Sequence, residues 1–424
     1  MSVVESVDVL IIGAGPSGAI AAALLVKKGY SVRVLEKETF PRFSIGESLL
    51  PQCMQYIEEA GMMDAVQAGG FQFKCGAAFL FNGRYTEFDF RDKFSPGWGT
   101  TFQIERARFD TILADEAARM GADVRFRHEI TGVDVSGDKP SVTYRDADDV
   151  EHTMQAKFLL DASGFGRVLP RLLDLHVPSD FPVRQSVFTH ITGLSDSDWY
   201  DSNKILITIH PKHRDVWFWL IPLGGGKASI GVVARVEFFD NYEGEPKDVL
   251  KTIYAEEPQL SSLLVDAEYN FPARKITGYS ASVKSLYGKN YTLLGNAGEF
   301  LDPVFSSGVT IAMRSASMAA ALLDRQLQGE EIDWESEFSI PLKKGVETFR
   351  TFVTAWYDQP FQNVIMHDLQ QREMAATGSG PANVRAMISS ILAGYAWDEA
   401  NPYVKDSKRR LSVLAELCRQ TTDG

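Results

Sequence analysis

An α/β fold is predicted, with a parallel sheet, an inserted antiparallel sheet and a helical C-terminal region. Three observations predict this fold. An apolar run enters a glycine-rich turn and a helix-compatible segment within Val7–Glu36. Short alternating strands then occupy Arg184–Val236, and helix-compatible segments fill Asp333–Gly424. Because strands that alternate with helices favour a parallel sheet, and short alternating strands favour an antiparallel one, two different layers are expected.

The first unit predicts a dinucleotide site. Gly13 allows a tight turn, Gly15 lets a pyrophosphate approach the backbone, and Gly18 lets the helix pack closely on the strand. The helix N-terminus offers free N–H groups to phosphates. Glu36 ends the second strand, where a carboxylate accepts hydrogen bonds from ribose hydroxyls; this disfavours a 2′-phosphate. The unit is therefore Rossmann-like and takes FAD or NAD.

Composition narrows the class of protein. The chain has 424 residues, 45% of them hydrophobic, and a net charge of −13, which repels nucleic acids and anionic membranes. Its cysteines, Cys53, Cys75 and Cys418, are too few and scattered for a disulfide framework or a metal cluster, so we expect reduced, buried thiols and no metal. Without a signal peptide or a membrane-length apolar run, a cytoplasmic protein is expected.

The segment after Glu36 predicts a loop, a helix and a hairpin. Pro41 and Gly46 shape the loop, and Leu50–Ala60 has helical spacing. One alternating run is expected over Lys74–Phe81 and a second over 85–90, joined by Asn82-Gly83, a strong hairpin signal. A helix is then predicted from about residue 108 to 120, and a turn between antiparallel strands over 134–148. We expect a division into a discontinuous dinucleotide-binding domain (1–80, 101–175 and 270–330), a substrate-domain sheet (81–100 and 176–269) and a helical region (331–424).

Four motifs carry a family resemblance. GAGPSG with Glu36, ERARFDTIL, DASGFG and GNAGEFLDPVFSSG occur in the order found in the glutathione-reductase-like flavoprotein superfamily, in the branch that includes aromatic hydroxylases. This resemblance implies FAD as the cofactor, with Arg106 near the pyrophosphate, and Asp161 and Asp302 near the flavin. The cofactor-binding residues that it implies are Gly13, Gly15, Ser17, Gly18, Glu36, Lys37, Ser48, Arg106, Asp161, Gly295, Asn296, Asp302, Gly308 and Val309.

Two further stretches resemble flavin-dependent halogenases. VWFWLIP matches their WxWxIP signature, and FQFKCGAAFLFNG resembles the segment that carries their essential lysine, here Lys74. In DPVFSSG, Ser307 and Gly308 match positions whose backbone N–H groups hold a halide; the same amides could instead hold flavin oxygens. The resemblance also implies that the space between flavin and lysine is lined by Trp217, Trp219, Ile221, Pro222 and Phe305.

The implied reaction is halogenation of an electron-rich aromatic substrate of the phenol, pyrrole or indole type. FAD, reduced by a separate reductase, would react with oxygen and chloride or bromide to give hypohalous acid, which Lys74 would present to a substrate that is free or tethered to a carrier protein. A desolvated amine suits this role. The chain departs from the pattern at Asn296, where Gly-Asp is usual, and lacks a recognisable additional glutamate; it looks closer to phenol and pyrrole halogenases than to tryptophan halogenases.

The sequence also allows two alternatives to a halogenase. A monooxygenase or a geranylgeranyl-reductase-like oxidoreductase of the same superfamily would share the FAD motifs. A non-catalytic flavin-carrying protein would use its tryptophans, and the aromatic residues from Phe349 to Tyr357, as a binding surface.

Overall fold

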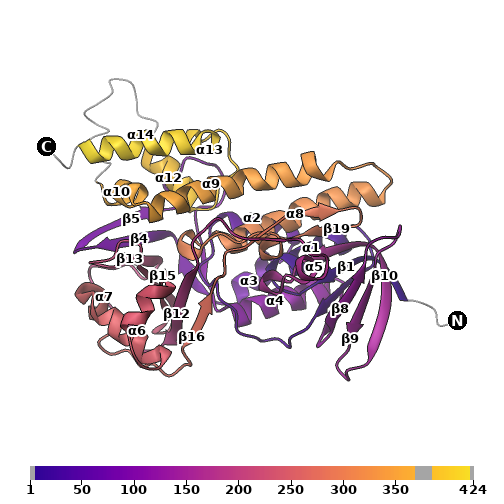
Figure 1. Ribbon diagram of the computed structural model, residues 1–424, viewed down its shortest axis with the longest axis horizontal. Helices are drawn as coiled ribbons and strands as arrows, with labels where there is room; N and C mark the ends of the chain where they lie inside the picture. Colours follow the sequence, from indigo (N-terminus) through magenta and orange to yellow (C-terminus); the bar gives the residue numbers. More distant parts are fainter. Residues whose placement is uncertain (1–4, 368–383, 421–424) are drawn as a thin grey trace.

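The computed structural model describes residues 5–367 and 384–420. Part of the predicted helical region, 368–383 and 421–424, lies outside the described residues. An eight-stranded sheet and a seven-stranded sheet lie side by side, and helices cover them (Figure 1).

The eight-stranded sheet is built around the strand of the glycine turn. Its main order is β18-β19-β10-β1-β2-β7, and the pairs formed by β1 with β10 and β2 are parallel. β9 pairs antiparallel with both β8 and β10 at one side of the sheet. The turn predicted over 134–148 is therefore too long: residues 141–145 form β9, and only the polar segment with Gly137 and Pro140 turns between β8 and β9. Its strands are β1 (Glu5–Ile12), β2 (Val32–Glu36), β7 (Asp123–Phe126), β8 (Glu129–Asp134), β9 (Ser141–Arg145), β10 (Glu151–Asp161), β18 (Tyr287–Gly288) and β19 (Tyr291–Leu293).

The seven-stranded sheet is antiparallel except at one pair. Its order is β16-β12-β15-β14-β13-β4-β5, and β13 pairs with β4 in parallel. The parallel pair arises because β4 comes from a much earlier part of the chain, and a long connection lets its strand enter in the same direction. The strands are β4 (Gly76–Phe81), β5 (Arg84–Asp89), β12 (Arg184–Ile191), β13 (Lys204–Ile209), β14 (Trp217–Gly224), β15 (Lys227–Arg235) and β16 (Arg274–Thr277).

Two-residue and three-residue strands form the remaining sheets. β3 (Gln72–Lys74) pairs with β6 (Thr101–Gln103), and β11 (His176–Val177) pairs with β17 (Ser282–Val283). The predicted continuous run Lys74–Phe81 is therefore wrong at Cys75. The backbone N–H of Cys75 donates to Asn203 and its carbonyl accepts from Phe90, so the chain passes there from one sheet to the other. The hairpin at Asn82-Gly83 is confirmed, and both residues have positive φ.

Helices cover both faces of the seven-stranded sheet. The C-terminal helices pack on one face in a core that includes Trp217 and Phe349, and α6 and α7 pack on the other face in a core that includes Phe218 and Leu250 (Figure 1). The helices are α1 (Pro16–Lys27), α2 (Gln52–Ala60), α3 (Met63–Ala68), α4 (Arg106–Arg119), α5 (Val168–Leu172), α6 (Pro246–Ala255), α7 (Pro258–Ser262), α8 (Ser307–Leu327), α9 (Ile340–Tyr357), α10 (Pro360–Met366), α12 (Val384–Leu392), α13 (Pro402–Lys405) and α14 (Ser407–Gln420).

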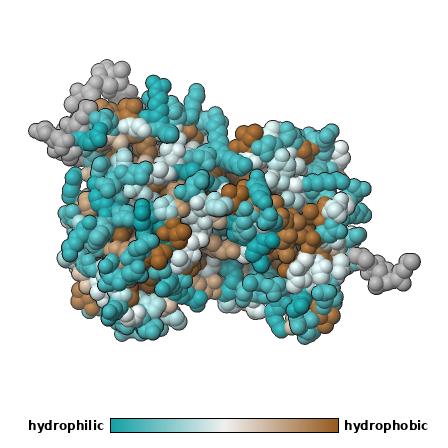
Figure 2. All heavy atoms as spheres, viewed as in Figure 1, coloured by the Kyte–Doolittle hydropathy of each residue, from teal (hydrophilic) through white to brown (hydrophobic). Residues whose placement is uncertain are grey.

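The face of the molecule seen in Figure 2 is largely hydrophilic. Figure 2 shows charged and polar residues over most of one face, with hydrophobic residues in small groups between them. Among the described helices, none combines the length and the apolar character needed to cross a bilayer. The predicted buried, free thiols are confirmed for Cys53, Cys75 and Cys418.

Candidate active site

A cavity of about 540 Å³ lies where the two sheets meet. Its walls come from the glycine turn after β1, the end of β2, the loop before α2, the N-termini of α4 and α8, and strands β13 and β14. The cavity brings together thirteen predicted site residues: Gly13, Gly15, Ser17, Glu36, Lys37, Ser48, Arg106, Asn296, Gly308, Val309, Trp217, Trp219 and Ile221.

The glycine turn has the predicted construction. A methyl group added to Gly18 would lie 2.0 Å from the carbonyl oxygen of Gly13, so only glycine lets α1 pack this closely on the strand. Within the part of the chain that the structure describes, no side chain caps the N-terminus of α1, so its first N–H groups can bind a phosphate. The carboxylate of Glu36 accepts a hydrogen bond from the N–H of Ala14 at 2.9 Å, which fixes it at the cavity wall.

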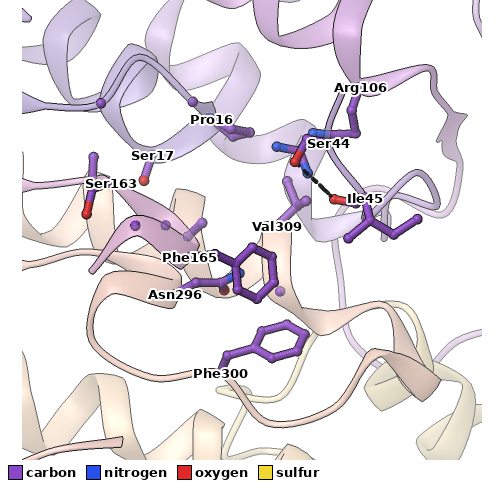
Figure 3. Close-up of a pocket in the computed structure, with 18 of the residues that line it drawn as sticks. Pro16, Ser17, Ser44, Ile45, Arg106, Ser163, Phe165, Asn296, Phe300 and Val309 are labelled. Atoms are coloured by element: carbon purple, nitrogen blue, oxygen red, sulfur yellow. Dashed lines mark hydrogen bonds between the residues drawn. The ribbon is translucent and has the colours of Figure 1, made fainter. Parts of the chain in front are cut away.

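Two arginines flank this turn and share one buried carboxylate. Arg106 donates to both oxygens of Asp110 at 2.8 and 2.9 Å, and its third nitrogen donates to the carbonyl of Ile45 (Figure 3). Arg42 donates to Asp110 at 3.0 Å and lies within 3.6 Å of the Cβ position of Gly15. Arg42 was not predicted as a site residue, because its loop carries no motif. The guanidinium groups of Arg42 and Arg106 together suit a pyrophosphate.

The opposite wall is polar and aromatic. Asn296 and Gly308 are neighbours there: a Cβ on Gly308 would lie 3.8 Å from the amide oxygen of Asn296. The rings of Phe165 and Phe300, also not predicted, pack edge to face at 5.3 Å beside them (Figure 3). Glu47 adds a carboxylate 2.6 Å from the imidazole Nε2 of His190.

The remaining predicted residues lie around the cavity rather than in its described lining, and several have structural partners. Asp161 accepts from the N–H groups of Ser163 and Leu169 at 2.9 and 2.7 Å, so it holds the turn after β10. The ring of Phe305 packs on Trp356 and Phe361 of the C-terminal helices. The other residues of this set are Gly18, Pro222, Gly295, Asp302, Ser307 and Lys74.

The tryptophan motif has its predicted alternation. Trp217, Trp219 and Ile221 line the cavity from β14, whereas Phe218 and Leu220 face α6 and α7. The indole of Trp219 lies over Gly231 of β15, where a Cβ would be 2.3 Å from the ring. Its N–H donates to the hydroxyl of Ser229 at 3.1 Å.

Tyr357 of α9 holds Trp217 in place, and Asp302 of the loop before α8 holds Tyr357. The indole N–H of Trp217 donates to the hydroxyl oxygen of Tyr357 at 2.9 Å, and that hydroxyl donates to Asp302 at 2.9 Å. Burial raises the pKa of Asp302 to about 6. The loop after Asp302 reaches α8, whose first residue is Ser307 and whose N-terminus has no side-chain cap. Its free N–H groups suit an anion.

Lys74 is fully buried just behind this cavity. Its ammonium donates to the hydroxyl of Ser48 and to the carbonyl of Leu49, both at 2.7 Å, and it lies 5.4 Å from the ring of Phe90. Since neither hydrogen-bond acceptor carries a charge, burial lowers the pKa of Lys74 to about 7. Ser48 also lines the cavity, so one hydroxyl connects the lysine with the space beside the glycine turn.

Known proteins resemble this chain over most of its length. The model of the FAD binding domain family matches residues 6–334. A 1H-pyrrole-2-carbonyl-[peptidyl-carrier protein] brominase of Pseudoalteromonas luteoviolacea is 30% identical over 342 residues, which cover 80% of this chain and 82% of the relative. A tryptophan 2-halogenase of Chondromyces crocatus is 32% identical over 338 residues, 78% of this chain and 63% of that one.

A solved structure shares the shape of almost the whole chain. The crystal structure of a flavoprotein/dehydrogenase from Cytophaga hutchinsonii superposes with a TM-score of 0.93 and 42% identity, covering 99% of this chain and 100% of the other. The fold predicted from the sequence, with FAD as cofactor, is confirmed by these matches.

Proposed function

The chain belongs to the family of flavin-dependent halogenases, and from this premise we propose that it halogenates an electron-rich aromatic substrate at Lys74. The observation that carries the proposal is the buried, uncompensated ammonium of Lys74, bonded to a serine of the cavity wall. A structural lysine would be expected to pair with a carboxylate or to reach water.

FAD fits the cavity between the two sheets. The uncapped N-terminus of α1, Arg42 and Arg106 would hold the pyrophosphate, Glu36 a ribose, and the wall formed by Asn296 and Gly308 the flavin end. When bound, reduced FAD would supply two electrons to oxygen and the halide the other two, so that one oxygen atom would leave as water and the other would become part of hypohalous acid. The free N–H groups at Ser307 and Gly308 would hold that halide.

Lys74 would then bind the hypohalous acid. With a pKa of about 7, the amine exists at neutral pH in both protonation states. The ammonium donates a hydrogen bond to the oxygen of HOX, and its proton leaves with the hydroxyl as water when the ring carbon takes the halogen. The neutral amine can accept the proton that the ring releases.

Trp217 and Trp219 would keep an organic substrate away from the flavin end. Both indoles are almost fully buried, are anchored by hydrogen bonds, and line the wall next to Ile205 and Ile221. Bulk at this wall lets a small oxidant pass more easily than an aromatic ring.

The substrate class is proposed from the relatives. A phenol, pyrrole or indole, either free or tethered to a carrier protein, is the expected substrate, because the P. luteoviolacea relative acts on a carrier-bound pyrrole. A separate flavin reductase would supply reduced FAD. A cytoplasmic location suits the three free cysteines.

The experiment is halogenation of an aromatic panel by the purified protein with FAD, a flavin reductase, NADH and bromide or chloride. We expect a halogenated product, and we expect Lys74→Met and Lys74→Arg to lose it about 100-fold or more while oxygen is still consumed. Equal product from the Lys74 variants contradicts the role of Lys74. Direct, substrate-stimulated oxidation of NADPH without a reductase, or halide-independent reduction of a prenyl chain, would instead favour the other oxidoreductases of the superfamily.

A further inference from the structure

We propose that Gln103 is a second binding residue for hypohalous acid, whose amide oxygen accepts the O–H of the oxidant while Lys74 donates to its oxygen. This inference rests on the proposed halogenase function. It identifies the group that would orient the oxidant, for which neither the motifs nor the relatives give a residue.

The strand register places Gln103 on the same face as Lys74 and Ser48. Lys74 pairs with Thr101 in the β3–β6 ladder, and Ser48 forms an antiparallel bridge with Gln103 on the other side of β6. Paired residues share a face, and residues two apart on one strand do too. β6 therefore lies between β3 and Ser48, and the lysine side chain crosses it to reach the serine hydroxyl at 2.7 Å.

The amide of Gln103 has one end held and one end unpaired. Its side chain is 0% exposed, and its Nε2 donates to the carbonyl of Ser202 at 3.1 Å. Its Oε1 is buried and accepts no hydrogen bond from the residues that the structure describes. Because the contact with Ser202 requires the amide nitrogen on that side, the oxygen cannot exchange places with it. A buried acceptor left unpaired is unfavourable, so a donor of matching size is expected there.

Hypohalous acid has the matching groups. Its oxygen accepts an N–H bond from Lys74, and its only O–H can donate to Gln103, which leaves the halogen free to point at the substrate. In the transfer, the carbon–halogen bond forms while the O–X bond breaks, and the hydroxyl leaves as water with a proton from Lys74. The ring carbon loses its proton to the amine, so one halide-bearing ring and one water result. Gln103 gains and loses no proton.

The first experiment compares product with escaped oxidant. The reaction mixture contains FAD, reductase, NADH, bromide and an aromatic substrate. It is run with the parent and with three variants, Gln103→Met, Gln103→Leu and Gln103→Glu. Hypobromous acid that escapes from the protein is trapped with monochlorodimedone. We expect the ratio of product to trapped oxidant to fall about ten-fold in the Met and Leu variants, which lack an acceptor, and to stay near the parent value in Gln103→Glu. The Glu variant lacks the donor to Ser202, so equal losses in all three variants would assign Gln103 a structural role and overturn the proposal.

Gln72→Leu is the matched control. Gln72 is the partner of Gln103 in the β3–β6 ladder, and its Nε2 reaches the same Ser202 carbonyl at 3.5 Å, but its side chain is partly exposed. We expect its ratio of product to trapped oxidant to equal that of the parent. A ten-fold loss in Gln72→Leu would show that the ladder, rather than the unpaired oxygen, controls the reaction.

A second experiment needs no flavin and so separates this inference from the halogenase function. One equivalent of sodium hypochlorite is added to each protein without FAD. The chloramine that remains after desalting is titrated with a thiol dye, and Lys74→Met gives the background. An N–Cl bond forms on Lys74 as the O–Cl bond breaks and water leaves. We expect about ten-fold less Lys74 chloramine in Gln103→Met and Gln103→Leu than in parent, Gln103→Glu and Gln72→Leu. If all these proteins retain equal amounts of Lys74 chloramine, the proposed role of Gln103 is overturned, even if the parent makes halogenated product. If the parent retains chloramine but makes no halogenated product in the first experiment, only the halogenase function is refuted.

Discussion

Two buried lysines of this enzyme have opposite surroundings. Lys74 is 0% exposed, and among the described residues its hydrogen bonds go to a hydroxyl and a carbonyl, so burial lowers its pKa to about 7. Lys204 is 4% exposed, lies 2.6 Å from a carboxylate oxygen of Asp201 and 3.2 Å from one of Glu87, and these partners raise its pKa. The ammonium of Lys74 therefore destabilises the folded state, whereas that of Lys204 stabilises it.

The first prediction is that Lys74→Met stabilises the fold near neutral pH. Between pH 7 and 10.5 the unfolded chain binds the lysine proton and the folded chain does not, so the parent's free energy of unfolding rises with pH. The variant lacks this rise. Its advantage is expected to be largest at pH 6 to 7, at most ~5 kcal/mol, and to shrink towards pH 10. Urea denaturation across this pH range measures it.

The control for this prediction is Lys204→Met. This variant leaves Asp201 and Glu87 without their cation, so its free energy of unfolding is expected to fall at pH 7. A Lys74→Met protein less stable than the parent at pH 6 would show that the ammonium of Lys74 is well accommodated, and would remove the thermodynamic argument for its function.

At the scale of elements, Tyr357 joins three parts of the chain. Its hydroxyl receives the indole N–H of Trp217 from β14 and donates to Asp302 in the loop that leads to α8. The guanidinium of Arg184 from β12 lies 3.4 Å from the centre of its ring. The C-terminal helix α9 is thereby connected to the aromatic wall of the cavity and to the loop before the proposed halide site.

Tyr357→Phe is expected to cost about 2 kcal/mol, because it leaves the N–H of Trp217 without its acceptor and removes a donor to Asp302. The pKa of Asp302, already about 6, is expected to rise further. The folded parent binds a proton there that the unfolded chain, with an ordinary pKa of 3.8, releases; its stability therefore decreases as pH rises from about 4 to 6. In the variant this decrease extends to higher pH, so the loss should be greater at pH 8 than at pH 5.

Tyr395→Phe is the matched control for Tyr357→Phe. Its hydroxyl donates to the backbone carbonyl of Trp98 at 2.8 Å, and this acceptor, unlike Asp302, is not a carboxylate. Its loss of stability, measured by the same denaturation, is expected to be the same at pH 5 and pH 8. A Tyr357→Phe loss that does not depend on pH would mean that Asp302 is not coupled to this hydroxyl.

Helix α8 gives a prediction about the halide. A methyl group on Gly308 would lie 3.1 Å from the ring of Phe300 and enter the cavity beside the first N–H groups of the helix. We expect Gly308→Ala to raise the KM for bromide about ten-fold with a smaller effect on kcat. The matched control is Ser306→Gly, since Ser306 has a φ of 56° just before the helix and glycine relieves that strain without adding bulk. An unchanged KM in Gly308→Ala would place the halide elsewhere.

Local signals predicted the elements well, whereas contacts between distant segments could not be predicted. The Asn82-Gly83 hairpin and the glycine turn at Gly13 depend on residues adjacent in sequence, and both were found. The bridge between Ser48 and Gln103 and the parallel pairing of β13 with β4 depend on segments far apart, which no local pattern specifies. For the same reason Lys74 could be predicted as a motif residue, but its hydrogen bonds to the loop before α2 could not.

At the scale of the whole molecule, residues of both sheets form the walls of the cavity. Its lining extends along the chain from Ile12 to Ala312, with the glycine turn on one side and Trp217 and Trp219 on the other. A ligand that contacts both walls binds only when both sheets are folded and in place. FAD is therefore expected to stabilise the molecule as one unit.

The prediction is that FAD at 100 times its dissociation constant adds about 2.7 kcal/mol to the free energy of unfolding and raises the temperature of the whole unfolding transition by a few degrees. Gly15→Val tests the cause. Gly15 has a φ of −66°, which any residue adopts, and its Cβ would meet only the guanidinium of Arg42 at 3.6 Å, so the variant should unfold like the parent without FAD. With FAD its transition should not move, because the added side chain stands where the pyrophosphate meets the turn. Calorimetry of both proteins, with and without FAD, measures these transitions. If FAD shifts only one step of a two-step transition in the parent, the eight-stranded sheet alone holds the cofactor. The wall formed by β14 would then contact only the substrate.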